Sequence, residues 1–455
     1  MEARFTSAEL ALATSGKWST SLPGTSSFAL TTDTRSCNTG KIFFALTGER
    51  FDAHDFLPQA VASGCTALCI NAAKQDRAPG GIPLLLVQDT LKAFQACAAF
   101  HRRRFKNLTV LGVTGSVGKT SVKEILRAIC SNIAGTAHVL YTEGNTNNQI
   151  GVAQNLLRLT GDHRYAILEA GTSSPGEIAP LAAMIKPDGA IVNSIAPCHL
   201  ENLKSLEGVA IEKGALLAAL PDNGDAVFPA ECAAKEKLAF AGRHTHTATF
   251  GLDGNGDYCA EYLGGTLSGS RFKLYFPTGE SFEISWDLSG SHNALNAAGA
   301  AALAHRCCKF APELIARALP YTKLPGMRMK RTEVNQVTYF NDAYNANPAS
   351  MRASLELLSQ SRLPGRLILV LGGMRELGAS EYDAHAEILA LKKRLLPEAL
   401  LLTIGKEFAG LSSNHFDTPE TAAEYLQKNI RPGDTVFAKG SRGNAVELIL
   451  PEEAR

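Results

Sequence analysis

The chain has 455 residues and a formal net charge of +1, with 45% hydrophobic and 20% charged residues, as in an ordinary globular protein of about three domains. Because the net charge is close to zero, no global field attracts nucleic acid or an anionic membrane, and we expect neither partner. No window approaches the ~20 apolar residues of a membrane span, and the N-terminus lacks the apolar core of a secretory signal. The ten cysteines include no Cys-x-x-Cys pair, which favours reduced thiols in a cytoplasm.

The first hundred residues predict a small α/β unit. Apolar runs at residues 42–46, 67–70 and 84–87 predict strands between turns that carry Gly and Pro, and residues 56–63 follow a helical pattern. The basic run at residues 101–104 leaves two interpretations open. It is either a nucleic-acid patch or, more ordinarily, a helix C-terminus whose positive charges suit the helix dipole.

A strand, a glycine-rich turn and a helix are predicted to follow one another from residue 108. Residues 108–113 are an apolar run, and apolar positions after residue 121 repeat at helical spacing. Such a turn points backbone N–H groups at an anion and leaves a helix N-terminus facing it. Lys119 can reach the β- and γ-phosphates of a nucleotide, and the Thr120 hydroxyl can ligate Mg²⁺. The expected nucleotide-binding residues are Gly115, Ser116, Val117, Gly118, Lys119, Thr120 and Ser121.

This turn is a variant phosphate loop, because the usual spacing would place Gly at the position of Val113. A plain glycine turn between a strand and a helix is the alternative. A plain turn would not need Lys and Thr at its end, so we predict that the chain binds a nucleoside triphosphate.

The strand–helix alternation continues through the middle of the chain. Residues 165–168 predict a strand that ends in Glu169, and residues 189–195 predict another that is followed by His199. Ligands of open parallel sheets bind at the carboxyl ends of the strands, so we expect both side chains beside the phosphate loop. Short β-like runs fill residues 251–286, and an Ala-rich helix is predicted over residues 293–306.

A second alternating unit follows residue 320. Four strands are predicted, at residues 337–340, 367–371, 400–404 and 435–438, with helices between them. We therefore predict an α/β fold of three domains: a small α/β domain, a central phosphate-loop domain on a parallel sheet, and a doubly wound, Rossmann-like domain. The predicted limits are residues 1–105, 106–319 and 320–455.

Ordered motifs along nearly the whole chain resemble those of the Mur ligase family. The most specific is Asn341-Asp342-Ala343-Tyr344-Asn345-Ala346-Asn347-Pro348. The others lie at residues 32–35, 48–56, 114–124, 144–151, 175–178, 199–201, 290–293, 326–329, 350–352, 376–378 and 439–442.

The resemblance implies a cytoplasmic, ATP-driven amide ligase of peptidoglycan precursor synthesis. It implies that the γ-phosphoryl group moves to the terminal carboxylate of UDP-MurNAc-tripeptide, and that the amine of D-Ala-D-Ala then attacks the acyl phosphate. ATP and Mg²⁺ are the implied cofactors, the two peptide-bearing molecules are the substrates, and a monomer is expected.

The resemblance also implies roles for individual residues. Lys119, Glu169, His199, Lys213 and Arg328 are the implied catalytic residues. Thr120, Glu169, His199 and Lys213 are the implied metal ligands, with Lys213 carbamylated. Asn293 and Asn296 are implied for adenine, and Arg328 and Asp342 for γ-phosphate and ribose. The implied substrate residues are Thr34, Arg35, Asn147 and Asn148.

Each residue also has an ordinary structural interpretation. Glu169 could cap a helix, and His199 could be a surface histidine. Lys213 could be a solvated helix lysine, Asn293 an N-cap, and the Asn147-Asn148 pair a turn. Two other functions stay open, a folylpolyglutamate-synthase-like ligase and a nucleotide-binding module without catalysis.

Overall fold

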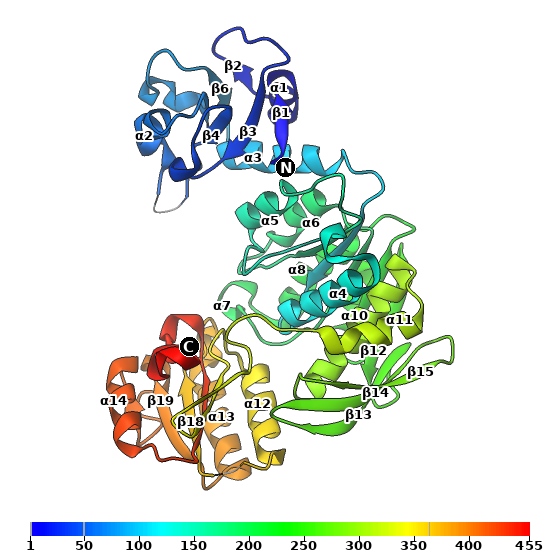
Figure 1. Cartoon of the computed structure of the whole chain (residues 1–455), viewed down its shortest axis with the longest axis vertical. Coiled ribbons are helices and arrows are strands. Elements are labelled where there is room, and N and C mark those ends of the chain that lie inside the picture. Colours follow the sequence, from blue (N-terminus) through cyan, green and yellow to red (C-terminus); the bar gives the residue numbers. More distant parts are fainter. Residues whose placement is uncertain (1, 49–50, 364) are drawn as a thin grey trace. The chain divides into compact units, whose positions relative to one another are not determined.

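The structure is a computed structural model that describes residues 2–48, 51–363 and 365–455. It contains three sheets, coloured from blue at the N-terminus to red at the C-terminus in Figure 1. The chain divides into two compact units. The first comprises residues 1–110, 137–170 and 180–186, and the second comprises residues 111–136, 171–179 and 187–455.

The first sheet has the strand order β1-β3-β4-β5-β6-β2. Strands β3 to β6 are parallel, and β1 and β2 are antiparallel at the edges. The strands are β1 Arg4–Thr6, β2 Lys17–Trp18, β3 Ser27–Thr31, β4 Lys41–Phe44, β5 Ala67–Asn71 and β6 Leu84–Val87. The helices are α1 Ser7–Thr14, η1 Thr34–Ser36, η2 Ala53–Phe56, α2 Leu57–Ala62, η3 Ala72–Arg77 and α3 Thr90–Arg102. The three predicted strands are confirmed as β4, β5 and β6.

The basic run at residues 101–104 ends helix α3, as the ordinary interpretation predicted. Arg104 pairs with Glu9 at 2.7 Å, and its guanidinium lies over the rings of Phe5 and Phe100. Arg102 is buried and donates to the carbonyl oxygens of Ile185 and Phe105. Two of the arginines are thus engaged inside the first unit.

The first unit also holds the parallel strands β8 Val139–Tyr141 and β9 Tyr165–Glu169. Helix η4 Thr136–His138 leads into β8, and α5 Gln149–Leu156 connects the two strands. Helix α6 Ile178–Ile185 follows β9.

In the second unit, adjacent strands run in the order β15-β14-β13-β12-β11-β10-β7. Pairing is parallel from β7 to β13 and antiparallel from β13 to β15, so this sheet is mixed where the sequence predicted a parallel one. The strands are β7 Thr109–Thr114, β10 Gly189–Val192, β11 Asp225–Pro229, β12 His246–Leu252, β13 Tyr258–Thr266, β14 Gly269–Tyr275 and β15 Ser281–Trp286. The helices are α4 Lys119–Ala134, α7 Leu200–Leu203, α8 Leu206–Ala218, α9 Lys235–Ala241, α10 Ser291–Cys308, α11 Pro312–Ala318 and η5 Leu319–Tyr321.

The third sheet, in yellow to red in Figure 1, has the order β16-β17-β21-β18-β19-β20. Its strands are β16 Lys330–Val334, β17 Val337–Asn341, β18 Leu367–Gly372, β19 Leu400–Ile404, β20 His415–Phe416 and β21 Thr435–Lys439. Its helices are α12 Pro348–Gln360, η6 Gly378–Ser380, α13 Glu381–Leu395, η7 Lys406–Phe408, α14 Pro419–Asn429, η8 Arg442–Asn444, η9 Val446–Ile449 and η10 Glu452–Ala454.

Two apolar cores flank the third sheet, which confirms the doubly wound prediction. Leu369 and Leu371 face a core that includes Met351 and Ile388, from α12 and α13. Ile368 and Val370 face the other core, which includes α14 and η9. Alternate residues of β18 point to opposite faces, so each continuous apolar strand fills two cores.

The predicted α/β fold is thus confirmed, and the domain limits at residues 105 and 319 stay predictions. No helix in the described part of the chain is long and apolar enough to cross a membrane.

Candidate active site

The predicted phosphate loop lies between strand β7 and helix α4, as expected. Lys119 begins the helix, and its Nζ donates to the Gly115 carbonyl oxygen at 2.7 Å. Ser116 Oγ donates to the Ala196 carbonyl oxygen at 2.9 Å, and Val117 N donates to Ser194 Oγ at 2.8 Å. Ser121 is buried in the first turn of α4. The loop is therefore held against the segment that follows strand β10.

Gly118 is the tightest point of the loop. Its φ of +81° lies in the left-handed region, which residues with a Cβ rarely adopt. A Cβ at this position would collide with Asn193 Nδ2 and lie 2.8 Å from Asn296 Oδ1. Both the backbone angle and the close approach of the two amides thus require glycine.

Asn193 connects the loop to helix α10. Its Nδ2 donates to the Val117 carbonyl oxygen and to Asn296 Oδ1, both at 2.9 Å. Sequence reasoning placed a strand over this residue and missed its side chain. The signal was available, since β10 ends at Val192 and polar residues after a parallel strand face the ligand edge of the sheet.

The two amides predicted to contact adenine both lie buried near the start of α10. Asn293 Nδ2 donates to the Ser289 carbonyl oxygen at 2.9 Å, and Asn296 Nδ2 donates to Asn293 Oδ1 at 3.3 Å. The N-cap of α10 is Gly290, so the interpretation of Asn293 as an N-cap is wrong. The amides orient one another and the phosphate loop.

Arg328 contacts the phosphate loop although it follows the predicted domain limit at residue 319 in the sequence. Its Nη2 donates to Thr120 Oγ1 at 3.0 Å, and its guanidinium carbon lies 3.8 Å from the centroid of the Tyr344 ring. Asp342 Oδ2 pairs with Lys439 Nζ at 2.6 Å, and Asp342 Oδ1 accepts from Met329 N at 3.2 Å. The structure therefore brings Lys119, Thr120 and Arg328 into one loop region.

His199 occupies the N-cap position of α7 with a left-handed φ of +52° and makes no side-chain cap hydrogen bond there. Its Nδ1 lies against a carboxylate oxygen of Glu376, whose pKa is lowered by the contact. His199 is thus a partnered side chain. Sequence reasoning placed Glu376 in a motif without assigning it this partner.

Lys213 is fully buried in helix α8, so its interpretation as a solvated lysine is wrong. Burial, and secondly the positive charge of Lys119, lower the pKa of Lys213 to about 8. A lowered pKa increases the share of neutral amine, which is the nucleophilic form.

Glu212, beside Lys213, is a buried carboxylate that sequence reasoning missed. It accepts hydrogen bonds from the backbone N–H groups of Gly176, Glu177 and Ile178 at 2.6, 2.9 and 2.7 Å. Orphan N–H groups at the start of α6 are thereby satisfied. Glu212 anchors the loop before α6 to helix α8.

Glu169 and the Asn147-Asn148 pair lie together in the first unit. Asn147 Nδ2 donates to Glu169 Oε1 at 2.9 Å, and Glu169 is buried at the end of β9. Asn148 is the N-cap of α5 and accepts from Ile150 N and Gly151 N. The pair is therefore more than a turn, because one amide orients Glu169 and the other begins a helix.

The predicted UDP-binding turn forms η1. Thr34 and Arg35 lie in this short helix, and Arg35 pairs with Asp33 at 2.7 Å. The hydrogen bond from Arg35 lowers the pKa of Asp33 to about 2. In the motif at residues 48–56, Glu49 and Arg50 lie outside the described residues, and Asp52 accepts from Lys74 Nζ at 2.7 Å.

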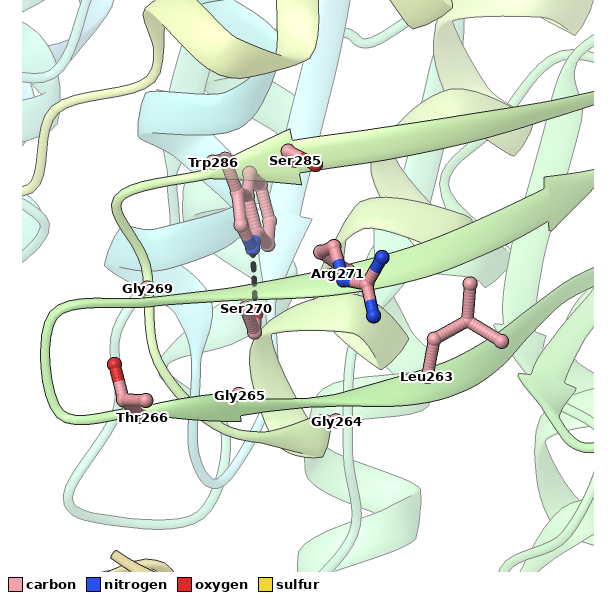
Figure 2. A pocket seen from close by; sticks show the side chains of 9 residues that line it. All are labelled: Leu263, Gly264, Gly265, Thr266, Gly269, Ser270, Arg271, Ser285 and Trp286. Carbon is pink, nitrogen blue, oxygen red and sulfur yellow. Dashed lines mark hydrogen bonds between the residues drawn. The ribbon is translucent and has the colours of Figure 1, made fainter. Parts of the chain in front are cut away.

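A separate hollow of about 440 Å³ lies on strands β13 to β15. Figure 2 shows the Trp286 indole N–H donating to Ser270 Oγ, at 2.9 Å, beside the exposed Arg271. The lining residues are Leu263, Gly264, Gly265, Thr266, Gly269, Ser270, Arg271, Ser285 and Trp286. They include none of the predicted active-site residues, so we assign this hollow no part in the reaction.

The described residues include no cluster typical of a metal site. Among residues 2–48, 51–363 and 365–455, no three His, Cys, Asp or Glu side chains cluster as a metal site. Mg²⁺ at phosphate sites keeps waters and takes only one or two carboxylates besides the phosphates. The Thr120 hydroxyl oxygen accepts a hydrogen bond from Arg328 at 3.0 Å, so Mg²⁺ bound there would compete with that guanidinium. This oxygen donor suits Mg²⁺.

The chain is similar to known ligases over nearly its whole length. Residues 113–304 match the Mur ligase middle domain, and residues 327–442 match the Mur ligase, glutamate ligase domain. The UDP-N-acetylmuramoyl-tripeptide–D-alanyl-D-alanine ligase of Escherichia coli is 36% identical over 439 residues, which cover 93% of this chain and 92% of that protein. A crystal structure of MurF from Acinetobacter baumannii has a TM-score of 0.89 at 29% identity, covering 99% of this chain and 98% of that one. MurF from Thermotoga maritima in complex with ADP has a TM-score of 0.81 at 25% identity, covering 93% and 96%.

We predict that Gly118→Ala weakens nucleotide binding by at least about tenfold, because a left-handed residue with a Cβ costs ~1–2 kcal/mol before the clash with Asn193 is counted. Calorimetric titration with a non-hydrolysable ATP analogue measures the change. Gly254→Ala is the matched control, since Gly254 has a φ of +93° but no atom within 4 Å of its Cβ position. Equal affinities of Gly118→Ala and wild type would contradict the prediction.

Proposed function

The chain belongs to the Mur ligase family, and we infer from this that it adds D-alanyl-D-alanine to UDP-N-acetylmuramoyl-tripeptide in peptidoglycan synthesis. The observation that carries the inference is near full-length similarity, 36% identity over 93% of this chain, to an enzyme of that name. The chain is an ATP-dependent ligase, and a relative of 25% identity was solved with ADP.

We propose that the reaction has two steps. An oxygen of the tripeptide's terminal carboxylate attacks the γ-phosphorus, the bond from that phosphorus to the bridging oxygen breaks, and ADP leaves. The D-Ala-D-Ala amine then attacks the acyl carbon, phosphate leaves, and the amine loses a proton. Phosphoryl transfer depends mainly on positioning and charge neutralisation. Lys119 at the loop and Arg328 beside Thr120 supply two positive charges for it.

The proposed Mg²⁺ ligands are the Thr120 hydroxyl, the Glu169 carboxylate, His199 and a carbamate on Lys213. When bound, Mg²⁺ neutralises charge on the phosphate oxygens. Asn147 would orient Glu169 through their 2.9 Å hydrogen bond. A carbamate would convert the buried Lys213 cation, 0% exposed, into an anion that can face a metal.

The remaining assignments concern the two substrates and the nucleotide. Asn293 and Asn296 are proposed for adenine, Asp342 for ribose, and Arg328 for γ-phosphate. Thr34, Arg35, Asn147 and Asn148 are proposed for the UDP-tripeptide. We propose a monomer, as the resemblance implies, and the use of ATP and a UDP-linked precursor supports the cytoplasm as the compartment.

Phosphate release should require ATP, Mg²⁺, UDP-MurNAc-tripeptide and D-Ala-D-Ala together, because both peptide substrates take part in bond formation. A coupled phosphate assay that omits one component at a time measures this. A folate with glutamate is the control pair. Turnover with that pair, and none with the peptide substrates, would favour the folylpolyglutamate-synthase-like alternative.

Lys119→Ala should lower kcat by ~10²–10³, the usual loss when one preorganised electrostatic contact is removed from a transition state. Binding of the UDP-tripeptide, measured by calorimetry, should be nearly unchanged because the residues proposed to bind it all belong to the first unit, whereas Lys119 belongs to the second. Lys106→Ala removes an exposed lysine before the same strand and should behave as wild type. Undiminished turnover in Lys119→Ala would show that this loop is not catalytic.

Lys213 should give a carbamate signal in ¹³C NMR when the enzyme is equilibrated with labelled bicarbonate. Lys213→Ala should lose the signal and most activity, and short carboxylic acids should partly restore turnover by replacing the carbamate. Lys237→Ala is the control, because Lys237 is half-exposed and pairs with Glu207. An unmodified Lys213 together with a fully active Ala variant would rule out the carbamate.

A further inference from the structure

Arg328 is held by two different contacts at once. One guanidinium nitrogen donates to Thr120 Oγ1 at 3.0 Å, and the guanidinium carbon lies 3.8 Å from the centroid of the Tyr344 ring. The first contact uses an N–H group of the guanidinium, and in the second the guanidinium carbon lies over the ring. A planar cation presented to an aromatic face in this way is stabilised by the ring quadrupole.

The segments that carry Arg328 and Tyr344 are themselves joined. Tyr344 N donates to the Met327 carbonyl oxygen at 3.2 Å, and Met329 N donates to Asp342 Oδ1 at 3.2 Å. These two bonds lie on either side of Arg328 in the sequence. The pair of Asp342 with Lys439 at 2.6 Å then fastens the turn to strand β21. The ring therefore has a fixed place relative to the backbone of Arg328.

Arg328 contacts Thr120 and Tyr344, and nucleotide binding would affect these two contacts differently. Thr120 is one of the proposed Mg²⁺ ligands, and Mg²⁺ held there would compete with the guanidinium for the hydroxyl oxygen. The Tyr344 ring offers no ligand to Mg²⁺ and competes for no phosphate oxygen. Its contact with Arg328 can persist while the N–H groups move to phosphate.

We propose that Tyr344 is a positioning residue for Arg328. Its ring holds the guanidinium within reach of the terminal phosphates, and would still hold it there if the Thr120 hydroxyl bound a metal ion. The proposal rests on the proposed role of Arg328 at the γ-phosphate. Tyr344 acts through Arg328 and touches no reacting atom in this account.

The test combines Tyr344→Ala, Tyr344→Phe, Arg328→Ala and the double variant Arg328→Ala/Tyr344→Ala. For each, kcat and the KM for ATP are measured separately, and calorimetry gives the affinity for a non-hydrolysable ATP analogue with Mg²⁺. Tyr344→Ala should lower kcat or analogue affinity by about 2- to 30-fold, the range for one cation–π contact. Tyr344→Phe should retain wild-type values because the ring is kept.

In the Arg328→Ala background, adding Tyr344→Ala should cost nothing further, since the partner of the ring is already absent. Tyr382→Ala, an exposed tyrosine on α13, is the matched control and should match wild type. Urea unfolding midpoints test whether Tyr344 only stabilises the fold. In that case Tyr344→Ala would lower the midpoint and turnover by the same amount whether residue 328 is Arg or Ala.

The possible outcomes separate the proposal from its premise. If Arg328→Ala matches wild type, the role of Arg328 at the nucleotide fails, and the positioning role falls with it. If Arg328→Ala is impaired but Tyr344→Ala costs the same with and without Arg328, only the positioning role is overturned. Wild-type behaviour of Tyr344→Ala, or equal loss in Tyr344→Phe and Tyr344→Ala, also overturns it.

Discussion

The side-chain amide of Asn193 holds the nucleotide region of the second unit together. It donates to the phosphate loop at Val117 and to helix α10 at Asn296, each at 2.9 Å. Gly118 makes room for it, because any Cβ there would occupy the place of the amide nitrogen. These contacts restrict the loop, which reduces the ordering cost when phosphate binds.

Arg328 and Thr120 meet although they are 208 residues apart in the sequence. This contact requires that the segment after Leu324 places Arg328 at the loop. It also requires that the turn at residues 342–345 holds Arg328 there. Met329, next to Arg328, has a left-handed φ of +56°, which a side-chain-bearing residue adopts only when its surroundings enforce it. The hydrogen bond from Met329 N to Asp342 is one contact that enforces it.

The sequence predicted elements best where burial alone decides them. Strand β18 is an apolar run buried on both faces, and such runs can hardly be anything but interior strands. The edge strand β16 of the same sheet, Lys-Arg-Thr-Glu-Val, was missed because an edge strand needs no apolar pattern and pairs through its backbone, here with β17. Helix α10 was predicted with nearly correct limits, but its N-cap was not, since Gly290 gives no side-chain capping signal.

Within the candidate site, the sequence predicted residues that belong to a contiguous motif. It did not predict residues whose role depends on contacts with distant parts of the chain. The phosphate loop is a contiguous pattern, so Lys119 and Thr120 could be predicted from spacing. Tyr344 belongs to the most specific motif, yet its contact with Arg328 depends on how two distant turns pack. Glu212 was invisible for a similar reason, because its three backbone donors at residues 176–178 come from another part of the chain.

The cationic side chains near the phosphate loop have partners that differ in charge. Lys439 pairs with the Asp342 carboxylate at 2.6 Å, whereas Lys119 donates to a backbone carbonyl, and Arg328 contacts a hydroxyl and a ring. All three donors are cations, so each of these hydrogen bonds involves a charged group, but Lys439 has an oppositely charged partner, whereas the partners of Lys119 and Arg328 are neutral. Exchanging a neutral partner for a phosphate oxygen therefore gains more than exchanging a carboxylate. On this argument Lys119 and Arg328 are the cations free to turn to a triphosphate, while Lys439 stays with Asp342 and keeps the turn that carries Tyr344 in place.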